Sequence, residues 1–182
     1  MERIAAVVPI KTFREAKGRL RTELGDSAAS DLAQKLARGV LESLRPLPTV
    51  VVTDDEAVAA FATGIGVEVL RQSKVGLNAA VSEGYDSLRG RTELVVIVHS
   101  DLAHPEGLAT YRYDDGITIW TDRDEQGTNV MCLPAGLDFT FSYGVGSAPL
   151  HRSAARELGI EPRWIAGSQW ALDIDEPSDL RQ

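Results

Sequence analysis

The sequence predicts a single α/β domain, a three-layer sandwich in which a mixed, mostly parallel sheet is covered by helices on both faces. Short apolar strands alternate with helix-like segments along the chain, and no repeat or linker divides its 182 residues. The proportions of 43% apolar and 25% charged residues are those of an ordinary globular domain. Ligands bind where the strands of such sheets end. We therefore expect functional residues just after Pro9, Thr53, Val98 and Ile174.

The first half of the chain predicts a regular alternation of strands and helices. The apolar runs at 4–9 and 49–53 predict buried strands. Asp26 is a suitable N-cap for a helix that carries apolar residues on one face and ends near Leu44, before two prolines. The other elements expected here are a helix that opens at 54–55 and ends near 64–66, a strand at 67–70 and a helix at 77–88.

The second half begins with the strongest strand signal, the run LVVIV at 94–98. Ser147 is expected to cap a helix that ends at Leu158, with Gly159 just beyond it. Asp175 could cap a last short helix. The remaining elements expected are a short helix at 105–111 and strands at 116–121, 131–134, 139–141, 162–166 and 171–174.

Composition and charge exclude several classes of function. The net charge of −8 argues against nonspecific binding to nucleic acid or to anionic membranes. No apolar run is long enough to cross a bilayer, and the N-terminal residues show no signal-peptide pattern. The single cysteine, Cys132, excludes an internal disulfide and fits the cytoplasm. The three histidines, His99, His104 and His151, show no metal-pair spacing. No order of Ser, His and Asp along the chain suggests a hydrolase.

A basic segment follows the first predicted strand. It holds five cations against one acid, Glu15, in a chain that is acidic overall. Such a segment is either a solvated surface or a specific anion site, and it lacks the glycines of a Walker A loop. As an anion site it would hold phosphates with side-chain cations. The cations are Lys11, Arg14, Lys17, Arg19 and Arg21.

Three aspartates are candidate metal ligands. Asp101 follows the strand at 94–98, and Asp173 and Asp175 flank Ile174 at the end of another predicted strand. Alternate residues of a strand point the same way, so the last two carboxylates can face one cavity. Converging carboxylates repel one another unless cations bind them, and Mg²⁺ prefers oxygen ligands. A helix-capping role for Asp175 is the alternative, and it does not exclude metal binding.

Two glycine turns and one asparagine complete the candidates. The turns at 127–129 and 144–147 could present backbone N–H groups to a carboxylate or phosphate, although most such turns are structural. Asn78 lies at a helix start, where capping is the ordinary role.

These segments together resemble a known family. The motifs PIKTFREAKGRL, GLNAAVSEGY, SDL at 100–102, QGTNVM, YGVGSAPLH and ALDIDEPSDL occur in the order found in the 2-phospho-L-lactate guanylyltransferase family. Phosphoenolpyruvate and 3-phosphoglycerate guanylyltransferases are members, and the family makes the activated precursor of coenzyme F-420. The resemblance covers nearly the whole chain.

The resemblance implies a Rossmann-like fold of the nucleotide-diphospho-sugar transferase type, and transfer of GMP from GTP to a small phosphorylated acid. It also implies two Mg²⁺ ions, a cytoplasmic enzyme and a possible homodimer. The residues implied are Asp101, Asp173 and Asp175 as metal ligands and, with Lys17, as catalytic residues; Thr128, Gly144 and Ser147 for the acceptor's carboxylate; Lys11, Lys17 and Arg19 for the triphosphate; and Asn78 near the guanine nucleoside.

Two alternatives stay open. Where members usually have prolines around the first aspartate, this chain reads VHSDLAHP. That change makes a catalytically silent nucleotide-binding protein conceivable. A different acceptor, such as a sugar phosphate or a molybdopterin, is the other alternative, and the lack of a GGxGTR-like loop argues against it.

Overall fold

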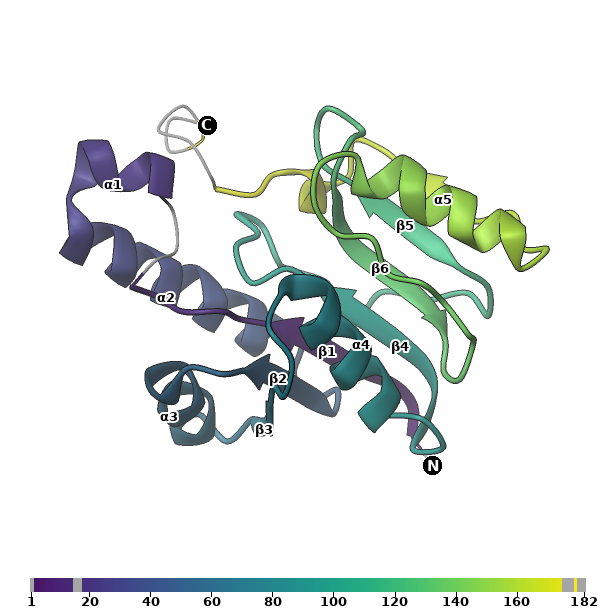
Figure 1. Ribbon diagram of the computed structural model, residues 1–182, viewed down its shortest axis with the longest axis horizontal. Helices are drawn as coiled ribbons and strands as arrows, with labels where there is room; N and C mark the ends of the chain where they lie inside the picture. Colours follow the sequence, from purple (N-terminus) through teal and green to yellow (C-terminus); the bar gives the residue numbers. More distant parts are fainter. Residues whose placement is uncertain (1, 15–17, 175–178, 180–182) are drawn as a thin grey trace.

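The computed structural model describes residues 2–14, 18–174 and 179, and these residues form one seven-stranded sheet between two layers of helices (Figure 1). The strands are β1 Glu2–Pro9, β2 Thr49–Thr53, β3 Glu68–Arg71, β4 Thr92–Val98, β5 Thr118–Thr121, β6 Thr128–Pro134 and β7 Arg163–Ile165. The helices are α1 Gly18–Leu24, α2 Asp26–Ser43, α3 Glu56–Gly64, α4 Leu77–Ser87 and α5 Ser147–Glu157, with a 3-10 turn, η1, at Gln169–Ala171.

The strand order is β3-β2-β1-β4-β6-β5-β7, which confirms the expected mixed, mostly parallel sheet. Only β6 runs against its neighbours β4 and β5, and the other pairs are parallel. In Figure 1, β3 lies at the lower left and β5 towards the upper right. The order reverses direction between β1 and β4, and in open α/β sheets a ligand crevice forms at such a switch point.

Two separate cores lie on the two faces of the sheet because side chains alternate along each strand. In β1, Ala6 and Val8 pack with α2 and α3, whereas Ala5 and Val7 pack with α4 and α5. Helix α4 approaches the sheet so closely that a Cβ at Gly84 would lie 2.6 Å from a methyl carbon of Val7. A larger residue would require β1 or β2 to shift, so glycine allows this part of α4 to lie close to both strands.

Several expected elements are wrong. Residues 105–111 form turns rather than a helix because Gly107 has a positive φ of 83°. Residues 139–141 are extended and pack into the core, but they join no strand ladder. The expected strand at 171–174 is replaced by η1 and by one isolated bridge at Asp173. The basic segment, for which no helix was predicted, overlaps helix α1 at residues 18–21.

Two helix starts also differ from expectation. Gly25 and Gly146 hold the N-cap positions of α2 and α5, so Asp26 and Ser147 are the first helical residues. Asp55 does cap α3, because its carboxylate accepts a hydrogen bond from the backbone N–H of Val58. The short helix expected after Asp175 lies outside the described residues. No helix in the described part of the chain combines the length and hydrophobicity needed to cross a membrane.

Candidate active site

The ends of the central strands meet at one edge of the sheet. Lys11 follows β1, and Asp101 lies three residues after β4. Because β6 is antiparallel to β4, its first residue, Thr128, lies at this same edge. The strands β1, β4 and β6 are direct neighbours. A cation, a carboxylate and a hydroxyl from three distant parts of the sequence are therefore brought to adjacent positions.

Asp101 and Asp173 lie on two segments that pair directly. Leu102 bridges Asp173 in an antiparallel sense. The backbone N–H of Ala103 donates to the carbonyl of Leu172 at 2.9 Å, and that of Ile174 donates to the carbonyl of Asp101 at 3.1 Å. The pairing joins residues 69 to 73 positions apart in the sequence, which periodicity could not predict.

The donor set at this point fits a hard cation such as Mg²⁺, since carboxylate oxygens are its preferred protein ligands. Asp175, the third expected ligand, lies outside the described residues. The described residues alone assemble no group of three His, Cys, Asp or Glu side chains that could hold a metal ion. A ligand role for Asp101 and Asp173 stays a prediction.

Asn129, in β6, binds the segment that carries Asp173. Its side-chain amide donates to the carbonyl of Trp170 at 3.0 Å and lies 3.4 Å from the carboxylate of Asp173. Asn129 is only 3% exposed, within a strand whose other side chains are mostly apolar. Its place in the apolar run TNVMCLP is the only sequence feature that could have indicated this role, and the sequence predicted it only as part of the turn at 127–129.

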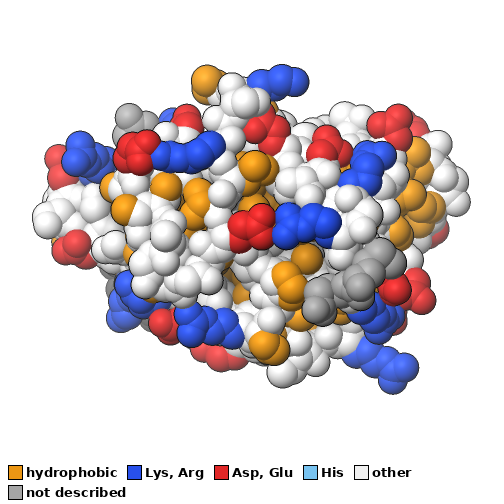
Figure 2. All heavy atoms as spheres, turned by 90° about the horizontal axis from the view of Figure 1, so that it is seen from below, with side chains coloured by type: hydrophobic (Ala, Val, Ile, Leu, Met, Phe, Trp, Pro, Cys, Tyr) orange, Lys and Arg blue, Asp and Glu red, His pale blue; other side chains and the backbone are white. Residues whose placement is uncertain are grey.

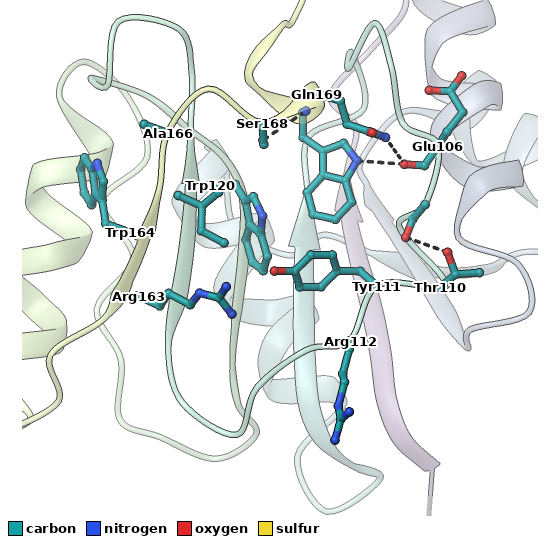
Figure 3. Close-up of a pocket in the computed structure, with 13 residues that line it drawn as sticks. Glu106, Thr110, Tyr111, Arg112, Trp120, Arg163, Trp164, Ala166, Ser168 and Gln169 are labelled. Atoms are coloured by element: carbon teal, nitrogen blue, oxygen red, sulfur yellow. Dashed lines mark hydrogen bonds between the residues drawn. The ribbon is translucent and has the colours of Figure 1, made fainter.

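An aromatic cluster fixes the two aspartate segments from the other side. The indole N–H of Trp170 donates to the carbonyl of Glu106 at 3.1 Å, and its ring lies 5.3 Å from that of Trp120. Tyr111 packs edge-on against both indoles (Figure 3). Trp120 and Trp170 are almost fully buried, so both act as packing residues here.

A hollow of about 750 Å³ opens beside this aromatic cluster (Figure 3). Arg112 and Arg163 lie at one end of it, and Trp164 points away from it. Arg163 is engaged by Asp114 at 2.5 Å. The hollow is lined from the turns at 106–112 and from β7, not by the aspartates at the ends of the central strands. We therefore do not place the reaction there.

The acceptor residues implied by the resemblance lie together at the start of α5. The backbone N–H of Thr128 donates to the hydroxyl of Ser147 at 2.9 Å, so this hydroxyl binds β6 instead of capping its own helix. The first two N–H groups of α5 already have partners: that of Ser147 donates to the carbonyl of Gly144 at 3.1 Å, and that of Ala148 donates to the carbonyl of Gln126 at 2.9 Å. The next residue, Pro149, has no N–H group. Side-chain hydroxyls are thus better placed than the first helical amides to bind an anion here.

His151 contacts one of the expected acceptor residues, Thr128, although its sequence position did not suggest a role at the site. Its Nδ1 lies 3.0 Å from the hydroxyl oxygen of Thr128, and its Nε2 accepts a hydrogen bond from the backbone N–H of Ser142 at 2.9 Å. The side chain is completely buried. Burial lowers the pKa of His151 to about 4, and the nearby His99 also lowers it. The sequence gives its helical position but not these partners.

Asn78 binds backbone rather than capping its helix. Its side-chain oxygen accepts from the N–H of Tyr143 at 2.6 Å, and its amide donates to the carbonyl of Tyr143 at 3.2 Å. The asparagine thereby ties the start of α4 to the loop that leads to Gly144. Direct contact with a nucleoside stays a prediction for this residue.

A smaller hollow of about 240 Å³ lies at the ends of the first strands. It is lined by β1, by the residues after β2 and β3, and by the start of α4, with Lys11, Asp54, Gln72 and Gly76 among its residues.

The other cations of the basic segment do not line this hollow in the described part of the chain. Lys17 lies outside the described residues, and the side chain of Arg19 is not described. Arg21 is structural, because its guanidinium donates to the carbonyl of Phe13 at 2.9 Å and to Asp26 at 2.9 Å.

Surface charge adds no large patch of one sign on the side seen from below. Figure 2 shows basic and acidic side chains lying next to one another there. The ion pairs of the protein include Arg3 with Asp115 at 2.8 Å and Arg91 with Glu68 at 2.9 Å.

Comparison with known proteins gives a consistent result. The protein is 33% identical to a phosphoenolpyruvate guanylyltransferase of Rubrobacter xylanophilus, over 97% of this chain and 91% of the relative. It is 30% identical to another of that name from Chloroflexus aggregans, over 98% and 96%. A putative nucleotide-diphospho-sugar transferase from Desulfovibrio desulfuricans has the same fold, with a TM-score of 0.80 at 15% identity over 99% of this chain and 85% of that one.

The family described as "Guanylyl transferase CofC like" matches residues 4–182. The match spans every strand end described above, from Lys11 to the Asp173 segment. The chain belongs to this guanylyltransferase family.

Proposed function

We propose that the protein transfers GMP from GTP to the phosphate of a small phosphorylated carboxylic acid and releases pyrophosphate. One observation carries the proposal: Lys11, the Asp101–Asp173 pair and the Thr128–Ser147 pair lie at the ends of neighbouring strands. They supply a cation for phosphates, carboxylates for a metal, and hydroxyls for a carboxylate. The sequence resemblance implies that this reaction belongs to coenzyme F-420 biosynthesis. The cytoplasmic location of the protein and its assembly as a homodimer remain predictions.

The acceptor belongs to a narrow chemical class. Relatives of this chain are named for phosphoenolpyruvate, for 3-phospho-D-glycerate and for 2-phospho-L-lactate. All three acids carry one phosphate and one carboxylate, and they differ by small groups between them. The hydroxyls of Thr128 and Ser147 suit the shared carboxylate, so the walls of the pocket would select among the acids.

The chemistry needs no protein base. An oxygen of the acceptor phosphate attacks the α-phosphorus of GTP, and the bond from that phosphorus to the bridging oxygen breaks, so that pyrophosphate leaves with its electron pair. The second pKa of a phosphate monoester is about 6, so the nucleophile already lacks its proton at neutral pH. The protein's tasks are to align the two phosphates and to offset their repulsion.

Asp101 and Asp173, together with Asp175, are the residues that would hold Mg²⁺. Bound there, the metal would neutralise charge on the reacting phosphates. Lys11, at the end of β1, is placed to bind the triphosphate as a point charge. The Thr128–Ser147 pair at the start of α5 orients the acid from the other side of β4.

The test is pyrophosphate release from GTP and Mg²⁺ with each of the three acids offered separately, beside a reaction without acceptor. We expect release with at least one acid and little without any. Asp101→Asn should abolish it, whereas Asp86→Asn, on the exposed surface of α4, should not. A folded protein that binds GTP but releases no pyrophosphate with any acid would favour a binding role.

A further inference from the structure

His151 links the start of β6 to the loop before α5 through both of its ring nitrogens. Nδ1 contacts Thr128, the first residue of β6, and Nε2 contacts the backbone of Ser142 in the loop between β6 and α5. The rings of Tyr143 and Phe139 lie 4.6 and 5.9 Å from the imidazole and keep it in place.

The contact with Ser142 decides where that proton lies. A backbone N–H can only donate, so Nε2 must be the acceptor and carries no proton. The buried imidazole is neutral near pH 7, because its pKa is lowered to about 4. A neutral imidazole holds one proton, which therefore lies on Nδ1 and is donated to the hydroxyl oxygen of Thr128.

The hydroxyl proton of Thr128 must then point elsewhere. The hydroxyl of Ser147 is in the same situation, because its oxygen accepts from the N–H of Thr128. Within the described part of the chain, neither hydroxyl proton meets an acceptor. The two residues are only 1% and 2% exposed, so an anion that reaches them is largely shielded from water, where hydrogen bonds to charge are strong.

We propose that His151 is a positioning residue for the acceptor: by donating from Nδ1 to Thr128, it makes the Thr128 hydroxyl a donor to the acid's carboxylate. The inference rests on the proposed function, since it assumes that the acid binds at Thr128 and Ser147. It assigns His151 an effect on binding of the acid and none on binding of GTP, whose expected hollow lies at the ends of β1, β2 and β3.

Two substitutions separate the two ring nitrogens. Asparagine places an amide donor where Nδ1 stands, and so it retains the bond to Thr128 but not the one to Ser142. Glutamine reaches the Nε2 position and loses the donor to Thr128. We expect His151→Asn to keep the KM for the acid within about threefold and His151→Gln to raise it about tenfold, the usual effect of one lost hydrogen bond to a charged group. Equal effects of the two variants, or a matching rise in the KM for GTP, would overturn the inference.

A double-mutant cycle tests whether His151 acts through Thr128. Thr128→Val removes the hydroxyl and should itself raise the KM for the acid. In that background, His151→Gln should change the KM by less than about twofold, because the interaction that it would break is already absent. Additive effects would show that His151 acts by another route.

The position of the proton can be measured without turnover. ¹⁵N NMR of the histidine-labelled wild-type protein should show a protonated Nδ1 and an unprotonated Nε2 for His151 at pH 7. The opposite tautomer would overturn the inference whatever the activity. A wild-type protein that turns over none of the acids would instead refute the proposed function, and the NMR result would still decide the proton assignment.

Discussion

The side of the site that would bind the nucleotide and the side that would bind the acid are built differently. On the nucleotide side the expected contacts come from cations such as Lys11, which is exposed at the end of β1. On the acid side they come from His151, Thr128 and Ser147, each 2% exposed or less and joined by hydrogen bonds. A triphosphate carries enough charge to be held by exposed cations, whereas a small acid must be oriented by directional bonds.

The two sides also select their ligands in different ways, one by charge and the other by directional hydrogen bonds. Exposed cations bind any polyphosphate, and salt weakens this binding. Buried hydroxyls with fixed protons reject a ligand that cannot accept from them, because the unpaired donor costs free energy. Breaking each side in turn should therefore have different consequences, and the largest effect is expected between them, at the aspartates.

Asp173→Asn should have the largest effect on turnover. The substitution keeps the shape of the side chain and removes the charge that would hold Mg²⁺ between the two sides. We expect pyrophosphate release to fall by at least about a hundredfold, since metal binding offsets several kcal/mol of charge repulsion. The melting temperature should stay within a few degrees of wild type, because the substitution keeps the shape of the side chain and an oxygen near the amide of Asn129.

The matched control is Asp86→Asn, which lies on α4 with its carboxylate 3.2 Å from Arg89. It makes the same chemical change at an exposed site, and activity should stay within about twofold of wild type. Full activity of a folded Asp173→Asn protein would remove Asp173 from the site.

The buried acid side should make stability depend on pH. The pKa of His151 is about 4 in the folded protein and about 6.5 when unfolded, so the unfolded state binds the extra proton between these values. Stability is therefore full above pH 6.5 and falls as the pH drops towards 4, by about 3 kcal/mol from this group. His99 is the other titratable group that acts on it.

Urea unfolding of the wild type and of His151→Gln, at several pH values from 7 to 4, isolates this contribution. The carboxylates common to both proteins, including Glu161 with its lowered pKa, cancel in the difference. The variant should lose the part of the slope that lies between pH 6.5 and 4. Parallel curves for the two proteins would mean that His151 does not titrate as a buried neutral group.

The sequence predicted the features that depend on local pattern and missed those that depend on contacts between distant residues. Continuous apolar runs such as 94–98 predicted the central strands, and the strand-end rule placed Lys11 and Asp101 at one edge. The bridge that joins Asp173 to Leu102 depends on tertiary pairing, which leaves no periodic signal. His151 and Asn129 look like ordinary residues of a helix and a strand, because a hydrogen-bond partner distant in sequence cannot be inferred from spacing.

Glycine and aromatic residues account for the errors in secondary structure. Gly107 and Gly146 adopt positive φ angles, which ended one expected helix and moved the start of another. The extended segment at 139–141 carries strand-like alternation, but its buried phenylalanines pack beneath α5 rather than pairing with a neighbouring strand. Pattern predicted the burial of these side chains and not the hydrogen bonds of their backbone.

Trp170→Phe should weaken the alignment of the aspartate segments. It keeps an aromatic ring against Trp120 and removes the N–H that donates to Glu106. We expect a loss of about 1–2 kcal/mol in the free energy of unfolding, from one hydrogen bond and a smaller ring. The kcat should fall more than either KM changes, because the substitution shifts the two paired segments that carry Asp101 and Asp173 rather than a substrate contact.

Tyr113→Phe is the control for Trp170→Phe. It also removes one buried hydrogen bond, from the Tyr113 hydroxyl to the carbonyl of Leu108 at 2.8 Å, in the same aromatic cluster. Its loss of stability should be similar and its kcat close to wild type. If both variants lose kcat equally, the cluster acts through stability alone.

The smallest effects should come from the basic segment, where two cations test the nucleotide side. Lys11→Gln should raise the KM for GTP about fivefold with little change in stability, since an exposed charge contributes about 1 kcal/mol.

Arg21→Gln should lower the stability and leave the KM for GTP nearly unchanged. The guanidinium of Arg21 binds Phe13, Ser30 and Asp26, and its side chain is only 16% exposed. Its loss of stability should be about 1 kcal/mol, with the KM for GTP within about twofold. Steady-state kinetics at two salt concentrations would complete the comparison. If Lys11 binds the triphosphate, the KM for GTP should rise less steeply with salt in Lys11→Gln than in the wild type. Identical salt dependence would assign phosphate binding to other residues.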